Sequence, residues 1–373
     1  MPPDSSPPFT HLRAGLPPFH QQVPAPPSQG ALEKLPKWAI CIPLVIQWLW
    51  LGARHGSLTL PTVANPRITA GGMVGEGKLE YFAGMGPVAR AATARYCAVR
   101  VEEGLSSAAL QTALDEAALA FPVVAKPDLG LCGHGVRRVD SFAELRHYID
   151  HFPRGETVVL QDYLPQEGEA GIFYARDAGT GEGRVIGLAL REFPRVTGDG
   201  VRTLRALIAA DRRARQGVGS RWHECIHDAH RVPAPGEVVR LSTIGSTRVG
   251  GLYLDGEALI TPELTRAIDA VARDMPDFHF GRFDVRFDSL RELASGRGFS
   301  IMEVNGAGSE AIQAWDPGTP LLRGFAMIFA KQRLLFEIAS ARRRAGARPL
   351  SLLALARLNL RQQRLIARYP ASN

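Results

Sequence analysis

Two carboxylates and an amide lie in a pattern that could hold a metal ion. Asp284 belongs to the run GRFDVRF, and Glu303 and Asn305 belong to FSIMEVNG. Residues two apart on a strand point to the same face, and pairing of the two runs as a hairpin would bring Asp284 beside Glu303 and Asn305. Carboxylate and amide oxygens are hard ligands that suit Mg²⁺. The alternative is that Arg282 and Arg286 neutralise the carboxylates in ordinary cross-strand salt bridges.

A second pattern could bind phosphate. Lys126 follows the apolar run 121–125 and precedes a loop with glycines at Gly130, Gly133 and Gly135, in a chain with only five lysines among 44 basic residues. A lysine ammonium is a compact point charge, and glycines let backbone N–H groups approach an anion closely. The alternative is a turn-rich loop with a surface lysine. Neither the Rossmann GxGxxG fingerprint nor a GxxxxGK[ST] P-loop is present.

The elements that must position these residues are predicted to be a mixture of helices and strands. Apolar periodicity and turn residues predict strands at 121–125, 157–164, 185–195, 237–241, 250–254, 283–287 and 299–304, with another beginning at 171–174. They predict helices at 86–120, 141–152, 201–215, 262–275, 324–337 and 349–369. The stretch 57–78 is rich in turn formers and is expected to form loops.

Composition is that of a folded protein with room for two or three domains. The chain has 373 residues, of which 45 % are apolar and 22 % charged. Its four cysteines are far apart and form no CxxC pair, which favours a reducing compartment over a disulfide framework or structural zinc site. His223, His227 and His230 have a spacing compatible with zinc, but the region is loop-like and lacks an HExxH arrangement.

The two ends of the chain differ from its body. Residues 1–30 are proline-rich, without periodicity or signal-peptide features, and are expected to be disordered. The apolar run 38–51 is too short to span a bilayer, and a buried strand or helix is favoured over contact with a membrane surface. Eight arginines and no acidic residue follow residue 338, and they account for the net charge of +7. The body is therefore not expected to bind nucleic acid.

In their order along the chain, these patterns resemble the ATP-grasp superfamily over residues 85–335. Lys126 and the glycine loop come first, and the end of the strand 157–164 matches the adenine hinge. Glu169 matches the ribose-binding carboxylate, and the D…ExN triplet of Asp284, Glu303 and Asn305 closes the domain. The element VTGDGVRTL at 196–204 is similar to one in cyanophycin synthetases, so the chain resembles their branch, which includes D-alanine–D-alanine ligase.

The resemblance implies an α+β (α/β) ATP-grasp fold in which two α+β subdomains clamp ATP. A disordered tail (1–30) and a smaller N-terminal region (31–84) would precede the ATP-grasp domain (85–335). That domain would divide into a first subdomain with the glycine loop (85–184) and a second with the metal site (185–335). A basic amphipathic helix (336–373) would follow, able to lie on an anionic membrane, pack on the enzyme or bind a partner.

The resemblance also assigns roles to individual residues. The nucleotide would be bound by Lys126, Gly130, Gly133, His134, Gly135, Gln161, Asp162, Tyr163, Leu164, Glu169 and Arg95, with Lys78 and Arg90 as alternatives to Arg95. One or two Mg²⁺ ions, or Mn²⁺ in their place, would be held by Asp284, Glu303 and Asn305. The arginines Arg282, Arg286, Arg240 and Arg248 would stabilise an acylphosphate. Ser309, Glu310 and Asp316 lie where related ligases bind the acceptor, although helix capping or loop hydrogen bonds would explain them equally well.

The implied function is that of an ATP-dependent carboxylate–amine ligase. A small-molecule carboxylate would attack ATP to give an acylphosphate, and an amine would then displace phosphate to form an amide. The alternative is a catalytically inactive scaffold or sensor that keeps the ATP-grasp fold. The expected location is cytoplasmic, with the basic C-terminal helix able to touch the inner membrane surface.

Overall fold

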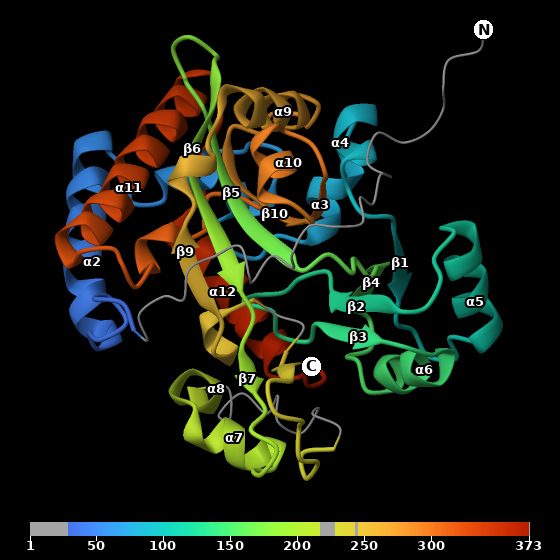
Figure 1. Cartoon of the computed structure of the whole chain (residues 1–373). Coiled ribbons are helices and arrows are strands. Elements are labelled where there is room, and N and C mark those ends of the chain that lie inside the picture. The colour runs from blue at the N-terminus through green and yellow to red at the C-terminus, as the bar shows by residue number, and fades with distance from the viewer. Residues whose placement is uncertain (1–28, 217–227, 243–244, 373) are drawn as a thin grey trace, which may run out of the picture. The chain divides into compact units, whose positions relative to one another are not determined.

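The computed structural model describes residues 29–216, 228–242 and 245–372. Nearly all of the expected disordered tail, together with His223 and His227, lies outside these residues. The chain forms two compact units, each built from separated segments (Figure 1). Unit 1 comprises residues 1–94, 164–190 and 254–359, and unit 2 comprises residues 95–163, 191–253 and 360–373. The expected mixture of helices and sheets is confirmed.

A five-stranded sheet in the order β11-β10-β5-β6-β9 forms the framework of unit 1. The predicted hairpin is present, because β10 pairs with β11 in antiparallel fashion. Phe280, Phe283 and Phe287 in β10 are fully buried, so this strand crosses the centre of an aromatic core. The strands are β5 (Gly168–Arg176), β6 (Gly183–Glu192), β9 (Leu252–Asp255), β10 (Phe280–Phe287) and β11 (Phe299–Asn305).

Helices α9 (Pro262–Arg273) and α10 (Leu290–Ala294) pack against β5 and β10, as Figure 1 shows. The side chain of Thr261 caps α9 by accepting from the N–H of Leu264, and Pro262 occupies its first turn. The long helix α11 (Leu321–Arg344) packs against α2 and two short 3₁₀ turns, η1 (Leu60–Val63) and η7 (Ile312–Trp315). Short elements complete this unit: η2 (Thr69–Gly72), α3 (Lys78–Ala83), α4 (Pro87–Ala91) and η6 (Glu257–Leu259).

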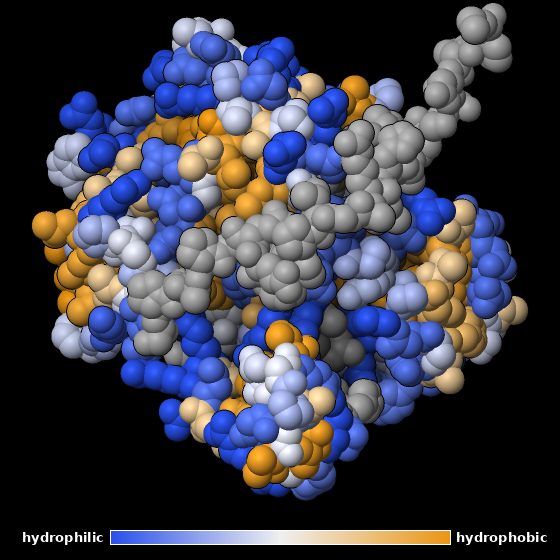
Figure 2. Space-filling view, viewed as in Figure 1, coloured by the Kyte–Doolittle hydropathy of each residue, from blue (hydrophilic) through white to orange (hydrophobic). Residues whose placement is uncertain are grey.

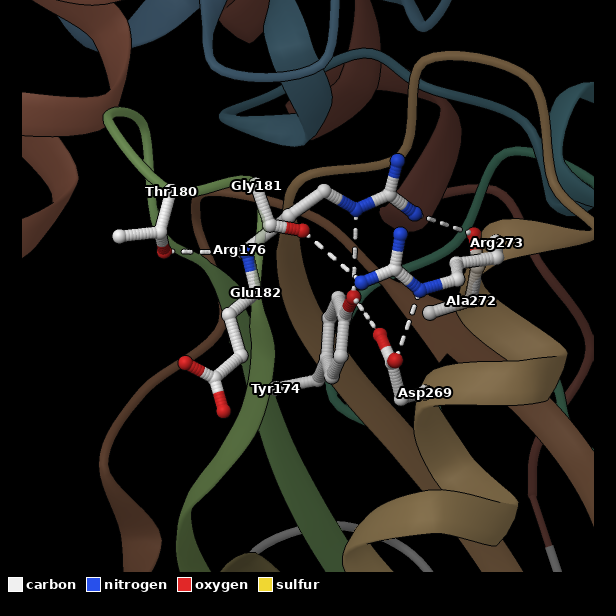
Figure 3. Close-up of polar contacts among 8 residues, drawn as sticks. All are labelled: Tyr174, Arg176, Thr180, Gly181, Glu182, Asp269, Ala272 and Arg273. Carbon is white, nitrogen blue, oxygen red and sulfur yellow. Dashed lines mark hydrogen bonds and ion pairs between the residues drawn. The ribbon is translucent and has the colours of Figure 1, made fainter.

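A polar cluster fastens β5 to α9 (Figure 3). The hydroxyl of Tyr174 donates to Asp269 Oδ1 at 2.7 Å and accepts from Arg176 Nε at 3.2 Å. Arg273 Nε donates to Asp269 Oδ2 at 2.7 Å, and its Nη2 donates to the carbonyl of Gly181 at 2.8 Å. Burial and the hydrogen bond to Asp269 raise the pKa of Tyr174 to about 12. Since neighbouring residues of a strand point to opposite faces, Phe173 lies on the other face of the sheet.

Helix α2 (Lys37–His55) confirms part of the favoured prediction for the run 38–51, which was a buried strand or helix. The run is helical and buries Ile40 and Leu51, but much of its apolar surface is exposed: Trp38 is 69 % exposed and Ile46 is 61 % exposed. The exposed face also includes Ile42, Val45, Leu49 and Trp50. Figure 2 shows apolar residues at the left margin of the view, over α2 and the neighbouring part of α11. No described helix is long and apolar enough to cross a membrane.

Unit 2 contains a four-stranded antiparallel sheet in the order β1-β4-β2-β3. Its strands are β1 (Tyr96–Arg100), β2 (Val123–Pro127), β3 (Arg137–Val139) and β4 (Thr157–Asp162), and it packs against α5 (Ser107–Glu116) and α6 (Phe142–Asp150). The prediction of a helix over 86–120 is therefore wrong in part, because β1 lies between α4 and α5. Ser106 and Ser141 cap α5 and α6 as serine N-caps do.

The rest of unit 2 is a small second core. Helices α7 (Leu204–Ala210) and α8 (Arg212–Gln216) replace the single helix predicted over 201–215. The two-stranded pair β7 (Arg195–Thr197) and β8 (Val238–Arg240) and the turn η5 (Thr247–Val249) complete this part. The predicted C-terminal helix is α12 (Leu352–Ile366).

Candidate functional site

The three predicted metal ligands lie together at the β10–β11 pair in unit 1. Asp284 and Glu303 are partners in the strand register, and Asn305 Nδ2 donates to Asp284 Oδ2 at 3.1 Å. Arg282 also binds Asp284, through its Nε at 2.6 Å and its Nη2 at 2.9 Å. The Asp284 residue is only 2 % exposed, whereas the Glu303 side chain is 33 % exposed. Glu303 is therefore partly exposed, whereas Asp284 is buried.

Two further ion pairs lie near this cluster. Lys78 Nζ is 3.2 Å from Glu303 Oε1, and its side chain is buried. Arg286 Nη2 is 3.3 Å from Glu169 Oε2, and both side chains are buried. Asp284 is thus paired with an arginine, as in the salt-bridge alternative, but Arg282 lies on the same strand and not across from it. Arg286 forms its ion pair across strands with Glu169 on β5. Glu169, the expected ribose-binding carboxylate, is held inside the sheet.

The donor set of this cluster fits a divalent cation. Because Asn305 Nδ2 donates to Asp284, its Oδ1 is the amide atom left to coordinate a cation, alongside the two carboxylates. All three are hard oxygen donors, as Mg²⁺ prefers. Within the described part of the chain, no cluster of three or more His, Cys, Asp or Glu side chains is placed to hold a metal ion. The cluster at Asp284 falls outside that definition, because it contains two carboxylates and the amide of Asn305.

Lys126 occupies a buried position in β2 of unit 2. Its ammonium donates to Gln161 Oε1 at 2.7 Å, and both residues are less than 5 % exposed. In the antiparallel register Lys126 lies opposite Val159, so Gln161 is its diagonal neighbour on the same face. Two residues that the sequence assigned to nucleotide binding are therefore in direct contact.

The glycine loop after β2 has a left-handed backbone at three positions. Cys132, Gly133 and Gly135 have φ values of 50°, 74° and 74°. A Cβ at Gly135 would lie 2.7 Å from the Pro127 ring and 3.1 Å from the Cβ of Tyr369, so the position requires glycine. Burial and the nearby charge of Arg248 lower the pKa of His134, which is therefore mainly neutral at pH 7.

Long-range hydrogen bonds hold this loop from two directions within unit 2. Arg248 Nε donates to the carbonyl of Cys132 at 3.0 Å. From the C-terminal segment, Gln362 Nε2 donates to the carbonyl of Gly130 at 3.1 Å and the Tyr369 hydroxyl donates to that of Leu129 at 2.6 Å. The Ser372 hydroxyl donates to the carbonyl of Gly133 at 2.8 Å and accepts from the N–H of Gly135 at 3.1 Å.

The structure assigns local contacts to most of the other predicted residues. Arg95 Nε donates to Asp162 Oδ2 at 2.7 Å, and the Arg138 guanidinium lies 4.5 Å from the Tyr163 ring centroid. Arg240 lies over the Phe193 ring and donates to the Ser242 carbonyl, and Arg90 donates to the Met85 carbonyl. Asp316 accepts from the backbone N–H of Gly318, close in sequence, and from that of Asp255, 61 residues away. Asp316 therefore has the loop-capping contacts that were its alternative.

Three residues whose side chains could take part in binding or catalysis were not identified from the sequence. Glu76 is in a loop of unit 1, and burial raises its pKa to about 7. Gln313 and Lys331 line a cavity between β5, β6 and α11. Lone Glu, Gln and Lys residues in loops and helices carry no motif. The only available signal was the rarity of lysine, which applies equally to Lys331 and Lys126.

Comparisons with known proteins give structural likeness only. No family model and no curated protein matches the chain. A bifunctional glutathione synthetase from Pasteurella multocida matches with a TM-score of 0.36 and 15 % identity, over 72 % of this chain and 39 % of that one. D-alanine–D-alanine ligase from Bacillus anthracis gives 0.40 and 14 %, over 72 % and 69 %, and the D-cycloserine synthetase DcsG gives 0.37 and 13 %, over 69 % and 70 %. The chain thus spans well under half of the glutathione synthetase and is similar in structure to these three enzymes.

Proposed function

We propose that this protein is an ATP-grasp ligase that joins a carboxylate to an amine at the expense of ATP. The observation that carries the proposal is the meeting of Asp284, Glu303 and Asn305 on neighbouring strands, with Arg282 bonded to the same carboxylate. A purely structural sheet does not need two adjacent carboxylates and an amide, since each buried carboxylate must be compensated by a cation. The sequence order of Lys126, the glycine loop, Glu169 and this triplet supports the same class.

The reaction has two steps. A carboxylate oxygen of the acid substrate attacks the γ-phosphorus of ATP, the bond to the bridging oxygen breaks, and ADP leaves. The amine nitrogen then attacks the acyl carbon, inorganic phosphate leaves, and the nitrogen loses a proton to form the amide. Phosphoryl transfer depends mainly on positioning and on neutralising the phosphate oxygens.

The chain's own residues provide that neutralisation. Lys126 would bind phosphate oxygens, with Gln161 fixing the direction of its ammonium. Backbone N–H groups of the glycine loop would add donors. Arg282 would exchange part of its contact with Asp284 for the acylphosphate. Asp284, Glu303 and Asn305 would hold Mg²⁺, which when bound reduces the charge repulsion among phosphate oxygens.

The test is ADP release measured with pooled amino acids, small organic acids and amines in the presence of Mg²⁺. Lys126→Ala and Glu303→Ala should each reduce turnover by about 100-fold or more, since they remove charge from the reacting phosphates. Lys37→Ala and Glu102→Ala change exposed residues of the same charge and serve as matched controls. Unchanged activity in both site variants would overturn the site assignment.

The second candidate function is an inactive ATP-binding scaffold. It is favoured by one observation, namely that Asp284 and Glu303 already have cationic partners in Arg282 and Lys78. A scaffold would bind nucleotide but release no ADP with any acid and amine pair. Nucleotide binding measured beside ADP release therefore separates the two functions.

We also propose a cytoplasmic location with peripheral contact to an anionic membrane surface. The separated cysteines support a reducing compartment. The exposed apolar face of α2 supports the membrane contact, together with the absence of acidic residues from 35 to 75 and after 337. Tryptophan and arginine side chains suit the boundary between lipid headgroups and acyl chains. This adds α2 to the C-terminal helix as a candidate contact.

A further inference from the structure

A cavity of about 670 Å³ lies in unit 1 between the sheet and helix α11. Its floor comes from β5 and β6, through Phe173, Val185, Ile186 and Gly187. Helix α11 contributes a wall with Met327, Ala330, Lys331 and Leu334. The volume is in the range of pockets that enclose small organic ligands. The lining combines apolar side chains with the charged or polar side chains of Asp255, Glu257, Gln313, Arg323 and Lys331, and these polar groups determine what can bind.

Lys331 is the cation of this cavity. Its Nζ lies 6.0 Å from the Phe173 ring centroid and 5.8 Å from that of Phe280. Among the described residues its ammonium has no ion pair or hydrogen bond and contacts only these two rings. Burial, with a smaller contribution from the charge of Arg282, lowers the pKa of Lys331 to about 7, and the charge of Glu310 opposes this shift. Such an amine is poised to gain a proton when an anion comes beside it.

Gln313 supplies an acceptor without a partner. The residue is 8 % exposed, and its Oε1 makes no hydrogen bond in the described structure. Its amide lies against Gly187, where a Cβ would come within 2.3 Å of Gln313 Nε2. A buried amide oxygen without a donor is unfavourable, because it has lost its hydrogen bonds to water. A ligand that brings an N–H or O–H to this atom would remove that cost.

The cavity also lies close to the carboxylate cluster. The Phe173 ring lies near both Lys331 and Arg282, and the Arg282 guanidinium is 5.6 Å from the ring centroid and bonds to Asp284. The other charged groups of the lining are Asp255, Glu257 and Arg323, which form an ion-pair group among themselves. Since Arg323 and Glu257 are exposed, this group forms the mouth and Lys331 the interior.

We infer that this cavity binds a small organic carboxylate with an apolar body and one hydrogen-bond donor. Its carboxylate pairs with Lys331, its donor is accepted by Gln313 Oε1, and its body packs on Phe173 and the aliphatic side chains of α11. As an identification of the acid that the ligase activates, this inference rests on the proposed function. As a statement about binding, it rests on the cavity alone.

The test is calorimetric titration of the full chain with N-acetyl-L-leucine, 3-phenylpropanoate and hexanoate at pH 8, in phosphate and in Tris. Because the pKa of Lys331 lies near 7, most of its amines are neutral at that pH, and carboxylate binding should take up a proton, seen as a buffer-dependent heat. The other charged groups of the lining are Asp255, Glu257 and Arg323, and the charges of Arg282 and Glu310 also act on the Lys331 amine. The neutral N-acetyl-L-leucinamide should bind at least tenfold more weakly than N-acetyl-L-leucine.

Variants test whether carboxylate binding depends on Lys331 and Gln313. Lys331→Met keeps the apolar packing and should abolish proton uptake and weaken carboxylate binding at least tenfold, while Lys331→Arg should retain binding. Gly187→Ala should weaken binding by crowding Gln313, and Lys37→Met on the exposed end of α2 should change nothing. Thermal denaturation checks that each variant is folded. Failure of all three carboxylates to bind, or equal binding by Lys331→Met, overturns the inference.

The outcomes also separate this inference from the ligase proposal. Lys331-dependent binding without ADP release under any amine supports the cavity assignment and contradicts the ligase. ADP release that Lys331→Met leaves unchanged supports the ligase and contradicts the cavity assignment.

Discussion

At the scale of single residues, this protein places charges inside the sheet of unit 1 and pairs them there. Arg286 with Glu169 and Arg282 with Asp284 are both largely buried. Breaking such a pair by removing one partner typically costs about 3–5 kcal/mol, because the other charge stays buried. The pairs therefore constrain substitution at these positions even where a residue never touches a ligand.

Tyr174→Phe tests the polar cluster of Figure 3. It removes the hydroxyl that donates to Asp269 and accepts from Arg176, so the free energy of unfolding should fall by about 1–2 kcal/mol at pH 7. The folded pKa of about 12 exceeds the ordinary value for tyrosine of about 10. The stabilisation is therefore fully present below pH 10 and is lost as the pH rises toward 12.

Urea denaturation at pH 7, 9 and 11 measures this difference between the variant and the natural chain. Tyr253→Phe is the matched control, because the hydroxyl of Tyr253 makes no hydrogen bond to any residue that the structure describes. A difference that stays constant from pH 7 to pH 11 would contradict the role given to the Tyr174 proton.

At the scale of elements, the glycine loop depends on a segment far away in sequence. Tyr369 donates to the Leu129 carbonyl and stacks on Phe152, with ring centroids 5.2 Å apart. Leaving a loop carbonyl without its donor should loosen the backbone of the whole loop. We therefore expect Tyr369→Ala to raise the KM for ATP severalfold if the loop binds phosphate, and to speed proteolytic cleavage within 129–135.

Limited proteolysis with mass spectrometry gives a readout that does not depend on activity. Arg364→Ala, which changes a residue of α12 without removing a contact to the loop, is the control. Loop cleavage that is as slow in Tyr369→Ala as in the natural chain would show that the C-terminal segment does not hold the loop.

The sequence predicted the elements whose pattern is local and missed those decided by tertiary contacts. The β10–β11 hairpin and the buried end of β2 follow from alternating apolar residues, and Asp284 and Glu303 came together as that hairpin required. Strand β1 was missed because its five residues lie among alanine-rich runs that favour helix. The pairing of Arg286 with Glu169 was missed because it depends on which strand becomes the neighbour of β10.

At the scale of the whole molecule, two surfaces are candidates for the proposed membrane contact. One is the apolar face of α2, and the other is the arginine-rich C-terminal helix. We expect the chain to sediment with vesicles that contain anionic lipid and to be released by salt, as polybasic binding is.

Trp38→Ser together with Ile46→Ser removes two of the most exposed apolar side chains of α2 and should reduce sedimentation at least fivefold. Leu322→Ser, which changes an exposed apolar residue outside α2, is the control. Removal of residues 360–373 tests the C-terminal helix. Absence of the full chain from the vesicle pellet at low salt would contradict the proposal for both surfaces.

The discontinuous units have a consequence for how this protein is made. Each unit is assembled from three separated stretches of chain, and unit 2 includes residues 360–373. As the ribosome releases the chain from its N-terminus, unit 1 has all of its parts only after residue 359 is made, and unit 2 only after the segment 360–373 is made. Folding of both units should therefore be slow, because contacts between distant segments require the closure of long loops. Fragments ending inside 254–359 should collect as chaperone-bound chains.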